Sequence, residues 1–195
     1  MEIKELRMRI LESFFPEGKP LTISEIRKKI NCSYERANTS LKKITKLKIL
    51  TEEKIGKTLV YSPDFNNLFM KLAYSNYQMK RLINFSQKNS KIYSVLNTLS
   101  GGSANMLLIF GSYARETNNK LSDVDVLVTS HKKSDMEYSI NSFESITGLN
   151  FSPISMSISE FPKIKTDNPE LWDELKRDAI VFQGILWLYH YFYEK

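Results

Sequence analysis

The stretch from Ile109 to Ser130, IFGSYARETNNKLSDVDVLVTS, constrains the fold of this chain more than any other. An apolar run over residues 106–110 is typical of a buried strand, and it ends in glycine and serine. After ten further residues, Asp-Val-Asp opens a second run with alternating valines. The pattern predicts a strand, a tight turn into a short helix over 112–117, and a strand over 123–129.

The same stretch carries two groups of residues suited to a nucleotide and a metal. Gly111 allows close backbone approach, and Ser112 adds a hydroxyl at a helix start, where free N–H groups attract phosphate. Asp123 and Asp125 are two apart on a strand, so their carboxylates share one face. Two adjacent carboxylates favour a cation, and oxygen ligands favour Mg²⁺. The alternative reading is a helix cap beside two surface aspartates.

This stretch resembles the signature of the minimal nucleotidyltransferases of the DNA polymerase beta-like superfamily. The matching residues are Gly111, Ser112, Ala114, Arg115, Ser122, Asp123 and Asp125. The resemblance extends more weakly from about residue 90 to 184, and it implies a mixed sheet flanked by helices. It implies that Asp123 and Asp125 are catalytic and bind Mg²⁺ (or Mn²⁺), with a nucleoside triphosphate, expected to be ATP, as substrate. Gly111 and Ser112 would hold the β- and γ-phosphates, and Arg115 a phosphate or the aspartate pair.

Two residues depart from the family pattern. Glu116 stands where the family usually has glycine after the arginine, a minor change on a helix surface. The third carboxylate, which the family places on the next strand, is missing, because residues 149–158 contain neither Asp nor Glu and Glu160 lies beyond them. Alternation alone predicts Ser155, and then Ser157, as the positions that face the aspartate pair. The sequence therefore predicts nucleotide and metal binding and leaves turnover open.

The basic charge of the chain is concentrated in its first third. Residues 1–65 contain 14 Lys and Arg against 9 Asp and Glu, whereas the remaining residues contain 14 against 13. Such an excess is an argument about partners rather than fold. A single cysteine, Cys32, excludes an internal disulfide framework. With charges in the first twenty residues and no apolar run long enough for a span, we expect a cytoplasmic protein outside the membrane.

Residues 1–64 are predicted to form three helices and a hairpin. Helical spacing begins at Ile3 and continues to Phe14, a Thr22–Glu25 capping box opens the second helix, and Ser33 caps the third. Gly56 and Lys57 connect two strands. This order resembles the winged helix-turn-helix family, with residues 33–47 as the recognition helix. Expected DNA-binding residues are Tyr34, Arg36, Asn38, Thr39, Lys42, Lys43, Lys54 and Lys57. The alternative is a solvated basic face on a protein-interaction or dimerisation domain.

The rest of the chain divides into a connector and the nucleotidyltransferase region. Residues 65–100 are predicted to be a helical connector with an apolar repeat at Phe65, Phe69, Leu72, Met79 and Ile83 and a second helix capped by Ser90. It is a candidate element for a homodimer. Residues 101–195 are expected to form the transferase domain that the resemblance implies. We expect a Ser134–Glu137 capping box that starts a helix ending at Gly148, followed by a strand over 149–158. A helix that Asn168 caps and Pro169 starts should run to about Arg177, followed by a strand over 180–182 and an aromatic helix over 187–193.

The sequence thus predicts an α+β protein with a winged helix domain before a small nucleotidyltransferase domain. The expected function is DNA binding together with Mg²⁺-dependent transfer of a nucleoside monophosphate to an unidentified acceptor, such as a toxin-like partner protein. Two alternatives stay open: a nucleotide-sensing transcription regulator, and an antitoxin with a catalytically silent transferase domain.

Overall fold

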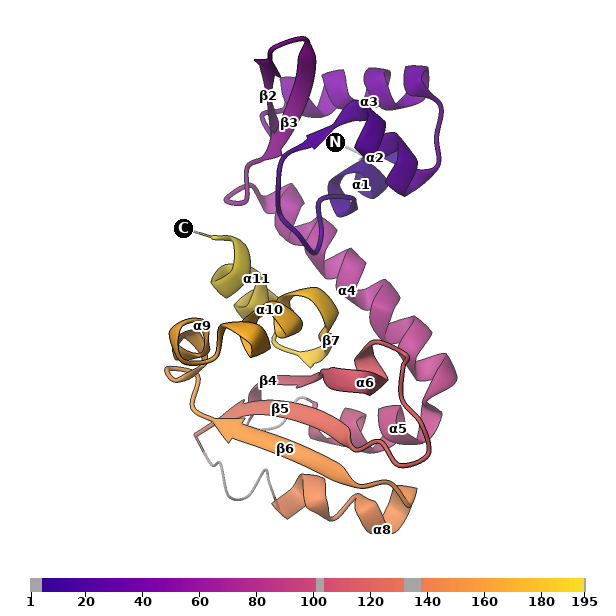
Figure 1. The fold of residues 1–195 in the computed structure, drawn as a ribbon, viewed down its shortest axis with the longest axis vertical. Helices are drawn as coiled ribbons and strands as arrows, with labels where there is room; N and C mark the ends of the chain where they lie inside the picture. The colour runs from indigo at the N-terminus through magenta and orange to yellow at the C-terminus, as the bar shows by residue number, and fades with distance from the viewer. Residues whose placement is uncertain (1–4, 101–103, 132–137, 195) are drawn as a thin grey trace. The chain divides into compact units, whose positions relative to one another are not determined.

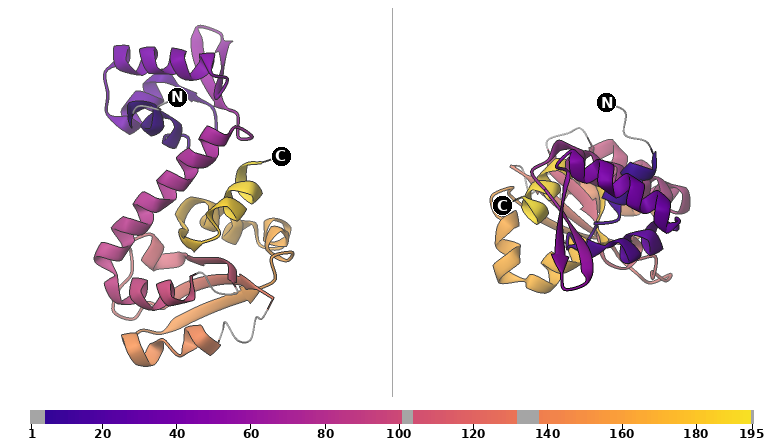
Figure 2. Two further views of the ribbon diagram at one scale, coloured as in Figure 1. Left: turned by 180° about the vertical axis from the view of Figure 1, so that it is seen from behind. Right: turned by 90° about the horizontal axis from the view of Figure 1, so that it is seen from above.

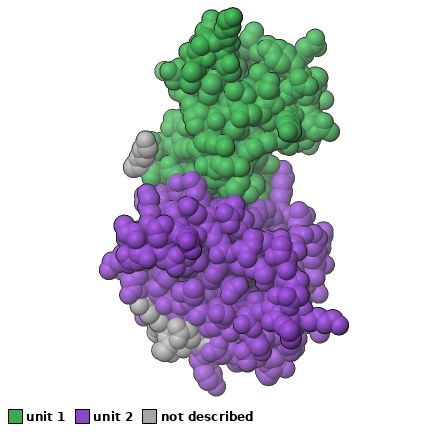
Figure 3. Space-filling model, in the orientation of Figure 1, with its two compact units in different colours: residues 1–77, 193–195 green, residues 78–192 purple. Residues whose placement is uncertain are grey.

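The computed structural model describes residues 5–100, 104–131 and 138–194. The chain forms two compact units: residues 1–77 with 193–195, and residues 78–192 (Figure 3). The division lies within helix α4 (Leu68–Lys88). The domain boundaries predicted at residues 64 and 100 stay predictions. A unit that is compact in the structure is not thereby shown to fold on its own. No helix of the described residues is long and apolar enough to cross a membrane.

Unit 1 consists of helices and a small antiparallel sheet (Figure 1). Its strands lie in the order β1-β3-β2, and the β2–β3 hairpin pairs from Leu50↔Pro63 to Ile55↔Thr58. The two-residue strand β1 was not predicted; it lies against β3 with Leu21 opposite Tyr61. The elements are α1 (Glu5–Glu12), β1 (Leu21–Thr22), α2 (Ile23–Ile30), α3 (Tyr34–Lys46), β2 (Leu50–Ile55) and β3 (Thr58–Pro63).

Local capping explains where the helices of unit 1 begin. The Thr22 hydroxyl accepts the Glu25 N–H while the Glu25 carboxylate accepts the Thr22 N–H, which confirms the predicted capping box. Ser33 caps α3 by accepting the Arg36 N–H. The buried face of α3 carries Ala37, Leu41 and Ile44.

Unit 2 is built on a mixed four-stranded sheet in the order β6-β5-β4-β7 (Figure 1). Strands β5 and β6 are parallel, whereas β4 is antiparallel to β5 and to β7, so the predicted helix-flanked mixed sheet is confirmed. The strands are β4 (Ala104–Ile109), β5 (Val124–Ser130), β6 (Phe151–Met156) and β7 (Ile180–Gln183). The helices are α5 (Ser90–Leu99), α6 (Gly111–Ala114), α8 (Glu144–Thr147), α9 (Ile164–Asp167), α10 (Pro169–Asp178) and α11 (Ile185–Tyr193), with the 3₁₀ turn η1 (Phe161–Lys163).

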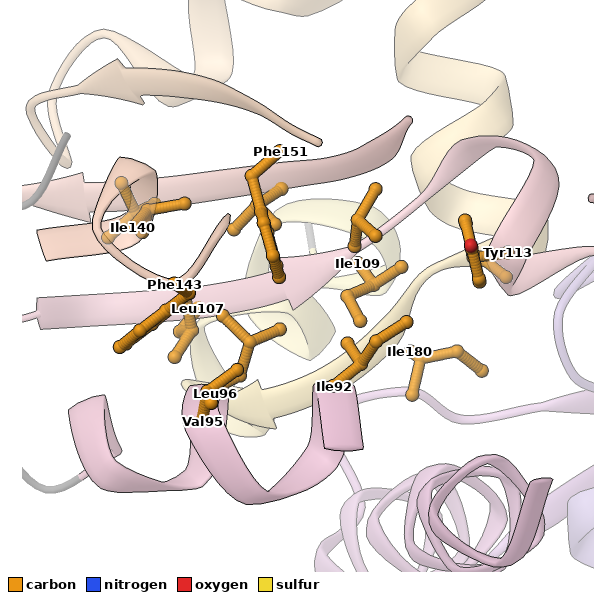
Figure 4. Close-up of a cluster of buried hydrophobic side chains, with 14 of the residues drawn as sticks. Ile92, Val95, Leu96, Leu107, Ile109, Tyr113, Ile140, Phe143, Phe151 and Ile180 are labelled. Carbon is orange, nitrogen blue, oxygen red and sulfur yellow. The ribbon is translucent and has the colours of Figure 1, made fainter. Parts of the chain in front are cut away.

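One face of this sheet forms the hydrophobic core with α5. Figure 4 shows Ile92, Val95 and Leu96 of α5 beside Leu107 and Ile109 of β4, and Figures 1 and 2 show α5 lying along this side of the sheet. The valines of β5 point into the same core. Because side chains alternate along a strand, the aspartates beside these valines lie on the opposite face.

Several predicted helix ends are corrected or confirmed in unit 2. Ser90 does not cap α5: Asn89 takes that position, because its carbonyl already accepts the Tyr93 N–H one residue earlier. Asn168 caps α10 through the Leu171 N–H, as predicted. Gly148 ends α8 in the left-handed conformation. The Ser134–Glu137 capping box lies outside the described residues.

Three of the five apolar residues in the repeat predicted for the connector lie on the exposed side of α4, whereas Phe69 is half-buried and Phe65 precedes the helix. Leu72, Met79 and Ile83 are each about half exposed, at 47%, 47% and 49%, and Leu68 is 65% exposed. The buried residues of α4 are instead Met70, Ala73, Tyr74, Gln78 and Phe85. Leu72, Met79 and Ile83 have the helical spacing that was predicted, but they form an apolar stripe on the protein surface.

Candidate nucleotide site

Gly111 follows the end of strand β4 in a conformation that favours glycine. Its φ is +70°, in the left-handed region. A Cβ at this position would lie 2.0 Å from Oδ2 of Asp125 and 2.8 Å from its Cγ. The Phe110 N–H also donates to the Asp125 carbonyl oxygen at 3.0 Å. The turn after β4 and the Asp125 carboxylate are therefore packed together, and only glycine leaves room for both.

The two aspartates lie at the start of strand β5. Val124 and Val126 are fully buried, so alternation directs Asp123 and Asp125 to the other face. Asp123 is exposed and Asp125 is half-buried. Burial, then the negative charges of Glu174 and Asp123, raise the pKa of Asp125, while Arg115 opposes the shift. A carboxylate in such surroundings is stabilised by a cation.

Arg115 is held by acidic residues that no local sequence pattern connects to it. Its Nη1 pairs with Oε1 of Glu174 and lies 3.9 Å from Oδ2 of Asp178. Glu174 and Asp178 are one turn apart on α10, so they share a face of that helix. That i, i+4 pair was visible in the sequence, but nothing local connects it to Arg115, 59 residues earlier. In this structure Arg115 links α6 to α10.

Ser112 and Ser122 have different local surroundings. Ser112 is half-buried within the four-residue helix α6. The Ser122 hydroxyl accepts the Asn119 N–H at 2.9 Å, and Asn119 Oδ1 accepts the Leu121 N–H at 2.8 Å. These bonds stabilise the loop that leads into the aspartate pair. The phosphate-binding role of Gly111, Ser112 and Arg115 stays a prediction.

The register of β6 corrects the choice of residues that face the aspartates. Asp125 pairs with Ser152, whereas Ser155 pairs with the core residue Val128. Neighbouring residues on paired strands point to the same side of a sheet, so Ser152 lies on the Asp125 face and Ser155 on the opposite face. Ser157 follows the end of β6, where its hydroxyl donates to Glu160 Oε2 at 2.9 Å. The prediction that every second residue of this strand faces the aspartates was right. The wrong set of residues was chosen, because Ser152 and not Ser155 lies on that face.

No third carboxylate is found on β6, and the described residues contain no group of three or more His, Cys, Asp or Glu that could hold a metal ion. Binding of a cation by Asp123 and Asp125 stays a prediction.

The predicted DNA-binding residues lie on exposed parts of unit 1. Tyr34 is 51% exposed on α3, and this helix also presents Arg36, Thr39, Lys42 and Lys43, whereas Asn38 is half-buried. Lys54 lies on β2, and Lys57 lies in the turn of the hairpin. Within the described ranges, no hydrogen bond or ion pair engages the four lysine side chains. Their role in DNA binding stays a prediction.

Comparison with known proteins finds one match. Searches of curated proteins and of solved structures found no significant similarity. Residues 90–182, slightly under half of the chain, match the family model described as nucleotidyltransferase domain. This range contains Gly111, the aspartate pair, Arg115 and Glu174, and it runs from α5 to β7. The region that holds the site is therefore nucleotidyltransferase-like, a similarity that indicates nucleotide transfer in general.

Proposed function

We propose that this protein is a DNA-binding nucleotidyltransferase that uses Mg²⁺ and ATP. The observation that carries the transferase part is the packing of the Asp125 carboxylate against the Gly111 turn. It leaves a backbone corner without a Cβ directly beside the Asp125 carboxylate, within a region similar to nucleotidyltransferases. Mg²⁺ would be held by Asp123 and Asp125 and would neutralise charge on the triphosphate.

The proposed reaction is the transfer of a nucleoside monophosphate from ATP to a hydroxyl group. The acceptor hydroxyl oxygen attacks the α-phosphorus of ATP, the bond from that phosphorus to the bridging oxygen breaks, and pyrophosphate leaves. The hydroxyl proton passes to a base or to water. Catalysis by positioning and charge stabilisation does not require the third carboxylate, so we expect slow transfer that depends on the acceptor. By resemblance, a toxin-like partner protein is the proposed acceptor.

Labelled ATP incubated with the protein, Mg²⁺ and a whole-cell extract tests the transferase. Wild type should label an acceptor and release pyrophosphate, and Asp123→Asn should do neither, because it removes an anionic metal ligand without changing the side-chain size. Absence of pyrophosphate release with every extract would refute transfer.

A second function is favoured by the missing third carboxylate. A nucleotide-sensing transcription regulator needs the nucleotide site and a DNA-binding unit, but no base. An antitoxin with a silent transferase domain is a variant of this alternative. Mg²⁺-dependent ATP binding without any transfer would select it, and a change in DNA affinity on adding ATP would separate the regulator from the antitoxin.

DNA binding is proposed for unit 1. The order helix, strand, helix, helix, hairpin supports a winged helix, and α3 supports recognition because its exposed face is basic while its other face is buried. The β2–β3 hairpin would serve as the wing, and its lysines Lys54 and Lys57 would contact the DNA. Binding of duplex DNA by the full chain should weaken as salt rises; binding that ignores salt would contradict a phosphate-based interface.

A homodimer is proposed through the exposed stripe of α4. Leu68, Leu72, Met79 and Ile83 are separated by four, seven and four residues, a spacing that reads the same in both directions. A two-fold interface requires such self-complementarity, since Leu68 would meet the second copy's Ile83 and Leu72 its Met79. Light scattering should give a dimer mass for wild type and a monomer mass for Met79→Lys; a monomeric wild type would refute the proposal.

A further inference from the structure

A basic pocket lies between α1 and α3 of unit 1, outside the nucleotide site. It encloses about 310 Å³, within the range of roughly 300–1,000 Å³ that is usual for small-molecule sites. The described residues that line it are Glu5, Leu6, Arg7, Arg9, Arg36, Ser40 and Lys43. Four of these carry positive charge and one carries negative charge, and Leu6 is the single apolar side chain among them. The four cationic side chains of this lining suit a compact anion.

The two helices present these groups toward the same space. On α3, Arg36, Ser40 and Lys43 are separated by four and three residues, so they share one face of the helix. From α1, Arg9 donates to the Ile30 carbonyl at the end of α2, which fixes its guanidinium beside the pocket. Arg7, also from α1, is half-buried. The cations therefore come from two packed elements and do not form a run along one exposed helix.

The positive charges in this pocket have few counter-charges. In the described part of the chain, no ion pair engages Arg7, Arg36 or Lys43, and Glu5 makes none with them. Cations that lie close together repel one another. In a concave site this repulsion is stronger, because the walls exclude part of the water that would screen it. An anion with several negative oxygens would relieve that repulsion, and the Ser40 hydroxyl could donate to one of them.

We infer that this pocket is a phosphate-binding site that includes Arg7 and Arg9 of α1 as well as Arg36 and Lys43 of α3. The phosphate can come from a free polyphosphate anion or from the backbone of DNA, and the DNA source rests on the proposed function. The site extends the expected DNA-binding surface beyond α3 and the hairpin. It also gives unit 1 a means to respond to a small anion, since Arg36 and Lys43 would be shared between the two ligands.

The test uses the full chain with two ligands, inorganic pyrophosphate and a labelled DNA duplex. Both titrations contain EDTA, so that the aspartate pair does not recruit the anion through a metal. Arg7→Gln removes one charge from the pocket, and Arg36→Gln, at an exposed position, carries the same test if the first variant folds poorly. Lys19→Gln is the matched control, because Lys19 is an exposed cation of the same unit that does not line the pocket.

Pyrophosphate affinity should fall by about tenfold or more in both pocket variants and stay unchanged in Lys19→Gln, since charge-assisted hydrogen bonds are lost. Loss of DNA affinity alone in the pocket variants, with a salt slope lowered by about 0.9, would assign the site to a backbone phosphate. The inference is overturned if neither ligand distinguishes the pocket variants from the control, or if neither binds at low salt. Pyrophosphate binding that depends on Arg7, without any DNA binding, would keep the pocket and refute the DNA proposal.

Discussion

The two units of this protein arrange their functional charges in opposite ways. In unit 1, basic side chains lie on exposed helix and hairpin surfaces, and Lys42 and Lys43 have no ion pair within the described residues. In unit 2, burial and then neighbouring charges raise the pKa of Asp125, and Arg115 is already paired with Glu174. Exposed charges add small contributions, whereas interlocked groups depend on one another. Single substitutions should therefore have graded effects in unit 1 and large effects in unit 2.

The largest effect is expected for Gly111→Ala. The new Cβ would collide with the Asp125 carboxylate, and alanine is also strained at a φ of +70°. Mg²⁺-ATP affinity and transfer should fall by about 100-fold or more, as when preorganised electrostatic groups are displaced. DNA binding by unit 1 should be unchanged. ATP titration and a DNA-binding assay on the same preparation measure both.

Gly148→Ala is the matched control for that substitution. Gly148 has the same φ of +70°, but no atom lies within 4 Å of its Cβ position. It therefore reproduces the backbone strain without the collision, and ATP affinity should stay close to that of wild type. If the two variants bind ATP equally, the contact between Gly111 and Asp125 has no part in the nucleotide site.

The next effect is a gain, expected for Ser152→Asp. This residue pairs with Asp125 on the neighbouring strand, so an aspartate there could act as the missing base. General bases contribute typically about 10²–10⁴-fold, and the lower end is expected for an unoptimised position. Pyrophosphate release in the presence of acceptor is the measurement. Ser155→Asp should give no gain, because it lies on the Val128 face; equal rates for both variants would contradict the register argument.

A graded effect is expected for Lys42→Gln combined with Lys43→Gln. Each lost phosphate contact should lower the slope of log affinity against log salt by about 0.9, so the pair should lower it by up to about 1.8. The Mg²⁺-dependent part of ATP binding, which is proposed for the aspartate pair, should not change. Fluorescence anisotropy with a duplex at several salt concentrations gives the slope, and an unaltered slope would remove these two lysines from the interface. Lys120→Gln, an exposed cation of unit 2, is the control.

The smallest effect is expected for Asp125→Asn, on the free energy of unfolding. Burial and neighbouring carboxylates raise the pKa of Asp125 above the ordinary value of 3.8, so the folded chain holds this proton more tightly than the unfolded chain. The free energy of unfolding should therefore fall as pH rises from that ordinary value through the raised pKa. Asp125→Asn should remove this dependence and be more stable than wild type at neutral pH.

Thermal melts of both proteins across the acidic range measure this difference. Added Mg²⁺ should raise the melting temperature of wild type and leave the variant unchanged, because the cation offsets the repulsion only where both carboxylates remain. A variant that melts below wild type at neutral pH would show that the carboxylate stabilises the fold.

The features that could be predicted from the sequence depend on neighbouring residues. The Thr22–Glu25 capping box and the Ser33 cap involve atoms three residues apart. The alternation in β5 is likewise local, and the expected strand and helix after residue 106 were found in order. Such patterns depend on a few consecutive residues, so they can be recognised without knowledge of the fold.

The features that were missed depend on how distant segments meet. The pairing of Ser152 with Asp125 is set by the register between β5 and β6, and a shift of one residue turns every side chain to the other face. Glu174 reaches Arg115 only because α10 packs near α6. Strand β1 exists because β3 offers it an edge, and two residues carry too little pattern to be recognised.

The contact between Gly111 and Asp125 has a consequence for mutational tolerance. Any missense change of a glycine codon adds a side-chain atom at Cβ, and here that atom meets the Asp125 carboxylate. In a saturation mutagenesis screen scored on nucleotide binding, position 111 should be as intolerant as position 125, although glycine bears no functional group. A second-site change that shortens residue 125 would relieve the clash but delete the carboxylate. The site is thus easily lost in one genetic step and has no simple intragenic suppressor.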